Sequence, residues 1–191
     1  MSLNSRALAL RLSTLVLPAL ALACRADLGG PTPPDAAPAV SGAAATQASQ
    51  AWTESLSAAL SGGQVTVILT EEQLTSALAQ RLEADPEPIL RSPAVFLRDG
   101  VIQVYGVAQQ GPFEVSVRLE ITPVLTSDGQ LRFELTSADF GPFPASEGIR
   151  ASISGMLSEA LVGPLGTLAT GIRVTSVAVA DGELAIVAEL R

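Results

Sequence analysis

The chain has 191 residues, of which 48% are hydrophobic and only 4% aromatic, so we expect a domain whose core is built mainly from aliphatic side chains. Its 11 basic residues are all arginine and stand against 19 acidic ones, giving a net charge of −8 that argues against a nucleic-acid partner. The sequence has no lysine or histidine and a single cysteine. This composition removes the usual general bases, Schiff-base lysines, disulfide frameworks and cysteine-rich metal sites.

The N-terminus has the pattern of an export signal. Arg6 and Arg11 precede a short apolar run that is too short to span a membrane. The run ends in LALAC, Leu20 to Cys24, which resembles a bacterial lipoprotein signal, in which the cysteine becomes the acylated N-terminus. We therefore predict a lipoprotein signal peptide over 1–23 and a lipid anchor at Cys24 on the extracytoplasmic face of the cell membrane. Alternatively, the same residues form an ordinary A-x-A cleavage site, and the product is a secreted protein with a free thiol.

A stretch rich in Gly, Pro and Ala follows the cysteine. It has almost no large apolar side chain, so it cannot bury enough surface to order itself, and we predict a flexible tether over 24–45. A single α+β domain is then expected over 46–191. Apolar residues at helical spacing, closed by Gly62-Gly63, predict a short helix over 44–60.

A strand and a second helix are expected next. Alternating apolar residues predict the strand: Val65, Val67 and Leu69. Thr70 and Gln73 form a capping box, which starts a helix over 70–84 that Pro86 ends.

Three Asp-Gly pairs mark turns between antiparallel strands. At Asp99-Gly100 and at Asp181-Gly182, a two-residue type I′ turn keeps the apolar residues of both strands on one face. At Asp128-Gly129 the same turn would place Ile121 opposite a threonine. A three-residue loop with Gly129 in the left-handed region instead brings Ile121 to Leu135.

The strand that begins after Pro112 shows the clearest alternation in the chain. Its odd-numbered residues are apolar and are expected to face the core: Phe113, Val115, Val117, Leu119 and Ile121. Its even-numbered residues are polar or charged, so we expect that face to meet water.

The stretch from Phe140 to Gly171 predicts a long helix with one apolar stripe. The stripe recurs at steps of three and four: Ile149, Ile153, Met156, Leu157, Ala160, Leu161, Leu165 and Leu168. Plain core packing would produce the same stripe. If instead it lines a ligand groove, the expected ligand-binding residues are Phe140 and Phe143 at the mouth, with Ile153, Met156, Leu157, Ala160 and Leu161 as the wall.

The order of these elements resembles that of the YpmS-like and LmeA-like exported proteins of bacteria. The stretches that carry the resemblance are a strand, the LTEEQL helix, the FLRDGVIQVYG hairpin, long strands around SDGQLRFEL, FGPFP before a helix, and a final VTSVAVADGELAIVAEL hairpin. The resemblance spans about Val65 to Leu190. It implies a fold like that of the tubular lipid-binding (TULIP) superfamily, in which a curved antiparallel sheet, here of about six strands, wraps a long helix in the C-terminal half, with one or two further helices N-terminal to it.

Two functions follow from these observations. The first is a membrane-tethered lipoprotein that binds a phospholipid or another acyl-chain ligand between helix and sheet, without catalysis and without a cofactor. The second is a lipoprotein with a filled core that scaffolds a protein partner in the cell envelope. Neither reading requires a metal site.

Overall fold

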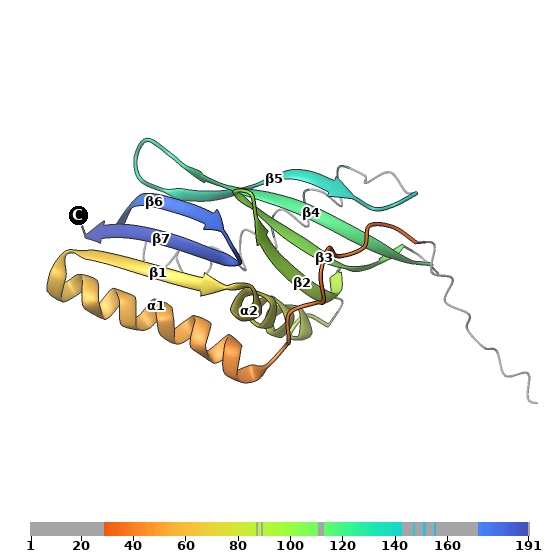
Figure 1. The fold of residues 1–191 in the computed structure, drawn as a ribbon, viewed down its shortest axis with the longest axis horizontal. Helices are drawn as coiled ribbons and strands as arrows, with labels where there is room; N and C mark the ends of the chain where they lie inside the picture. Colours follow the sequence, from red (N-terminus) through yellow and green to blue (C-terminus); the bar gives the residue numbers. More distant parts are fainter. Residues whose placement is uncertain are drawn as a thin grey trace, which may run out of the picture.

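The computed structural model describes residues 29–86, 88, 90–110, 113–142 and 172–190, together with the single residues 147, 151 and 155 (Figure 1). Two helices and seven strands lie in this part of the chain, which confirms the α+β class. The helices are α1 (Gly42–Gly62) and α2 (Glu71–Glu83). The strands are β1 (Gln64–Thr70), β2 (Leu90–Arg98), β3 (Val101–Gln110), β4 (Phe113–Leu125), β5 (Leu131–Asp139), β6 (Ile172–Ala180) and β7 (Glu183–Leu190).

The strands form two antiparallel sheets rather than the one curved sheet of about six strands that we predicted. One sheet has the order β1-β7-β6 and the other β2-β3-β4-β5. The prediction was wrong because β1, the first strand, pairs with β7, the last, along its whole length from Gln64 opposite Glu189 to Thr70 opposite Glu183. Local hairpin patterns carry no information about a pairing between strands so far apart in sequence.

Backbone hydrogen bonds join the two sheets where two Asp-Gly turns meet. The Gly182 N–H donates to the Leu97 carbonyl (3.1 Å) and the Gly100 N–H donates to the Val179 carbonyl (3.1 Å). At the other end of β6, the Val174 N–H donates to the carbonyl of Gly129 (2.9 Å). The turns therefore set the relative position of the sheets as well as reversing the chain.

The two type I′ turns are confirmed. Asp99 and Gly100 have φ of 52° and 81°, and Asp181 and Gly182 have φ of 51° and 83°. Both central residues of a type I′ turn need positive φ, which aspartate tolerates and glycine favours. The register follows as predicted, with Leu97 opposite Ile102 and Val179 opposite Leu184.

The longer loop between β4 and β5 is also confirmed. Gly129 has φ of 77°, and Thr126 and Gln130 are joined by a backbone hydrogen bond of 2.9 Å across the three loop residues. Ile121 lies opposite Leu135 as expected. A bulge then shifts the register between Glu120 and Ile121, so the first part of β4 pairs one residue further along β5.

Helix α2 protects the outer edge of the four-stranded sheet. Its capping box is present as predicted, with the Thr70 hydroxyl accepting from Gln73 N–H and the Gln73 side chain accepting from Thr70 N–H. Along the edge of β2, the Thr75 hydroxyl accepts from the Val95 N–H (2.9 Å) and the Glu71 carboxylate accepts from the Leu97 N–H (2.7 Å). These side chains pair edge donors that would otherwise be open to another strand.

Helix α1 lies along β1 (Figure 1) and is longer than the predicted 44–60 segment at both ends. It begins at Gly42, and Ala44 and Ala45 are buried, although both fall within the predicted tether. Gly63, with φ of 78°, ends the helix in the left-handed conformation expected of a C-terminal glycine. No helix in the described part of the chain is both long and apolar enough to cross a membrane.

One connected hydrophobic core runs through both sheets and both helices. Residues Val115, Val117, Leu119 and Ile121 of β4 are buried as predicted, but Phe113 is 38% exposed. Our assignment of Phe113 to the core was therefore wrong. The alternation of apolar and polar residues extends to the end of β4, but the elements that bury its inner face do not. The long helix predicted over 140–171 falls almost entirely outside the described residues.

Candidate functional site

The inner face of the four-stranded sheet is a continuous hydrocarbon surface. Each strand contributes residues from alternate positions, and all of them belong to the same core cluster: Val95, Leu97, Ile102, Val104, Ala108, Val115, Val117, Leu119, Ile121, Leu131 and Phe133. All carry aliphatic or aromatic side chains without a polar atom. Such a surface recognises hydrocarbon alone, whether it comes from this chain or from a ligand.

Phe140 lies beyond the end of β5 and belongs to that core. Its side chain is only 2% exposed. We had predicted it at the mouth of a possible ligand groove. A turn follows it, in which Gly141 has φ of 60°, but it leaves the aromatic ring inside the core rather than at the surface.

The other predicted site residues lie outside the described residues: Cys24, Phe143, Ile153, Met156, Leu157, Ala160 and Leu161. Within the predicted long helix, the structure describes Glu147, Ala151 and Gly155. All three are helical and exposed. Their spacing of four residues is that of neighbours on one side of a helix.

The outer face of the four-stranded sheet holds a second, smaller cluster that our sequence analysis missed. Ala94, Phe96 and Tyr105 are buried there, apart from the main core. The rings of Phe96 and Tyr105 meet edge to face, with centroids 5.6 Å apart and planes at 88°. The signal was present in the sequence, because residues 94–97 are apolar at every position, as in a strand buried on both faces.

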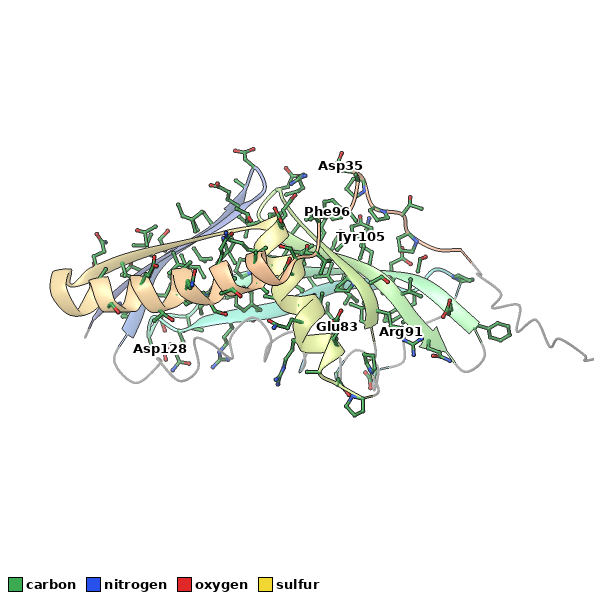
Figure 2. The ribbon with its side chains drawn as sticks, turned by 90° about the horizontal axis from the view of Figure 1, so that it is seen from below. Asp35, Glu83, Arg91, Phe96, Tyr105 and Asp128 are labelled. Atoms are coloured by element: carbon green, nitrogen blue, oxygen red, sulfur yellow. The ribbon has the colours of Figure 1, made fainter. Side chains whose placement is uncertain are left out.

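Residues 29–41, which we call the strap, pass over this outer face beside Phe96 and Tyr105 (Figure 2). Asp35 of the strap forms an ion pair with Arg98 (3.4 Å). Further along, the Ser76 hydroxyl accepts from the Ser41 N–H (3.1 Å) and donates to the Ala39 carbonyl (3.4 Å). The part of the predicted tether that the structure describes therefore contacts the domain, which we did not predict.

Arg98 links the strap to the rest of the fold. Its guanidinium also pairs with Glu71 of α2 and lies 5.9 Å from the centre of the Phe96 ring. Burial disfavours the charged form, but the carboxylates of Glu71 and Asp35 outweigh it and raise the pKa of Arg98 above its usual value. Arg98 is therefore charged at any physiological pH, and the network has no pH switch in this residue.

Several acidic residues of the described chain have structural positions. Asp99 and Asp181 occupy turns, Glu71 caps a strand edge, and Glu114 lies 4.0 Å from Arg91. No group of three or more His, Cys, Asp or Glu side chains in the described residues could hold a metal ion.

The chain matches a known protein family. The profile of a family described as "LmeA-like phospholipid-binding" matches residues 45–189, which is most of the chain. No curated protein matches the sequence. The matched range contains both helices except the first residues of α1, the seven strands except the last residue of β7, and the apolar sheet face. The strap lies before it.

Proposed function

Because the chain belongs to the LmeA-like phospholipid-binding family, we propose that it binds a phospholipid, or another ligand with an acyl chain, against the inner face of the β2-β3-β4-β5 sheet. The family match is the observation that carries this proposal. The chemistry of the sheet face supports it, since that face offers only hydrocarbon. Each ligand methylene that leaves water contributes about 0.8 kcal/mol, so an acyl chain needs no polar partner along most of its length.

The opposite wall of the site, in this proposal, is the long helix predicted over 140–171. Its stripe supplies Ile153, Met156, Leu157, Ala160 and Leu161, with Phe143 nearest the headgroup. Met156 is unbranched and flexible, so it adapts to chains of different shape. The ligand is bound and shielded from water, and no step of covalent chemistry is involved.

We further propose that Cys24 carries the acyl groups of a lipoprotein and holds the domain on the extracytoplasmic face of the membrane. The LALAC sequence and the presence of only one cysteine in the chain support this. An anchor of this kind would keep the domain beside the bilayer from which a phospholipid must come.

A second function remains, that of an envelope scaffold with a filled core and no ligand. The burial of the sheet face favours it, because Val115, Val117 and Leu119 are all 0% exposed. In a scaffold, the covering residues stay in place. In a lipid-binding domain, the ligand displaces some of them or packs beside them.

Replacing Leu157 with tryptophan separates the two functions. If Leu157 lines a lipid site, the indole should fill the space, reduce binding of a fluorescent fatty acid at least roughly tenfold, and leave the melting temperature nearly unchanged. If Leu157 lies in a filled core, the same change should overpack it and lower the free energy of unfolding by about 1–3 kcal/mol.

Leu78→Trp provides the matched control for this experiment. Leu78 is in the described core on α2 and is 7% exposed, so it shows what overpacking does to this domain. The scaffold function would be favoured by two results together. The Leu157→Trp protein would have a melting temperature as low as that of Leu78→Trp, and the unaltered protein would bind no fatty acid.

A further inference from the structure

The strap begins at a tight contact with the first part of β4. Gly30 has φ of 138°, and a Cβ atom there would lie 2.5 Å from the Ser116 carbonyl oxygen. A Cβ on Gly141 would lie 3.1 Å from the Gly30 Cα atom. The chain is thus seated between β4 and the turn after β5, in a place that only glycine fits.

Side-chain contacts hold the rest of the strap in place on the domain. Asp35 pairs with Arg98, and Ser41 and Ala39 both bond to Ser76, so the strap crosses from β4 to α2 over the outer face (Figure 2). At its N-terminal side, Gly30 lies against Ser116 of β4.

The first described residues of the strap lie close to an exposed aromatic side chain. Ser116 is three residues from Phe113, the first residue of β4, and three strand residues span about 10 Å. Phe113 is 38% exposed. The neighbouring carboxylate of Glu114 is near the guanidinium of Arg91, which offsets its charge.

The distance from the strap to the proposed anchor is short. Cys24 precedes Gly29 by five residues, which span at most about 18 Å when fully extended. A tether of the full 24–45 stretch would let the domain rotate freely relative to the bilayer. A five-residue tether instead determines which end of the domain meets the bilayer.

We propose that the end of the four-stranded sheet where β3 meets β4 faces the phospholipid bilayer, with Phe113 placed at the membrane interface. This inference rests on the proposed anchor at Cys24. A phenylalanine ring is apolar, and its insertion at the boundary between headgroups and acyl chains removes it from water, as for the apolar residues of interfacial helices. The β1-β7-β6 sheet, which Figure 1 shows at the opposite end of the molecule, then points away from the membrane.

Quenching of tryptophan fluorescence by brominated phospholipid tests the orientation. The acylated protein is purified from membranes and reconstituted in phosphatidylcholine vesicles with brominated acyl chains, in a Trp52→Phe background that removes its one native tryptophan. Phe113→Trp should lose at least roughly half of its emission, as expected for a ring at the interface. Ile68→Trp is the matched control, because Ile68 is also an exposed apolar residue (49%) but lies on β1, and its emission should change little.

A third variant tests the strap itself. Gly30→Val should displace the strap from Ser116 and lengthen the tether, so quenching at Phe113→Trp should fall toward that at Ile68→Trp. Equal quenching at both positions, or no quenching at Phe113→Trp in protein that floats with the vesicles, would overturn the orientation. Strong quenching that persists after Gly30→Val would overturn the role of the strap. Failure of the parent protein to float would overturn the anchor itself, and the orientation with it.

Discussion

Replacing Phe140 with alanine is expected to lower the free energy of unfolding by about 3–5 kcal/mol, the usual cost of truncating a buried phenylalanine. The ring is 2% exposed and belongs to the core cluster that joins both sheets, so its loss leaves a cavity that the surrounding strands cannot fill. Urea unfolding followed by circular dichroism measures the change. A loss of about 3–5 kcal/mol is a large fraction of the free energy of unfolding of a single domain.

Phe113→Ala is the control, since it removes the same side chain from a position that is 38% exposed. We expect it to cost less than about 1 kcal/mol, as surface substitutions usually do. If Phe140→Ala instead unfolds like the parent protein but loses ligand uptake, Phe140 lines the mouth of a groove, as its sequence context first suggested.

Cys24→Ser is expected to move the protein completely from the membrane fraction to the soluble fraction. The change removes the sulfur that would carry the diacylglyceryl group, and no described helix can span a membrane in its place. Fractionation of cells after a salt wash, with immunoblotting of both fractions, measures the shift.

Ala36→Ser introduces the same hydroxyl on the strap and leaves Cys24 intact, so it should stay with the membrane. Recovery of the Cys24→Ser protein in the washed membrane fraction would exclude acylation as the means of attachment. Recovery of the unaltered protein in the soluble fraction would favour secretion.

Local structure was predictable wherever a few neighbouring residues determine it. The capping box at Thr70, the two type I′ turns and the left-handed Gly129 all depend on residues that are close in sequence, and each was found as expected. The division into two sheets was not predictable in this way. It depends on the pairing of β1 with β7 and on hydrogen bonds between turns, such as that from Gly182 to Leu97.

The strap shows a different limit of sequence patterns. Most of its residues have small or cyclic side chains, and composition alone indicated a tether without structure. Its contacts are made instead by backbone groups at Ala39 and Ser41, by the charge of Asp35, and by the absence of a side chain at Gly30. Hydrophobic periodicity does not register contacts of these kinds.

The burial of the two phenylalanines, Phe113 and Phe140, was not predictable for a related reason. Phe113 follows the alternation of β4 and was predicted to face the core, yet it is 38% exposed, whereas Phe140, predicted at a groove mouth, is 2% exposed. Burial depends on what lies over the end of a strand, and that is set by the other elements.

Native mass spectrometry of the soluble Cys24→Ser protein tests lipid binding most directly. If the domain binds a phospholipid, we expect a species heavier than the unliganded chain by the mass of one phospholipid, which organic extraction removes and identifies. A spectrum that contains only the unliganded chain, from protein that was never exposed to detergent and whose extract holds no phospholipid, would contradict phospholipid binding.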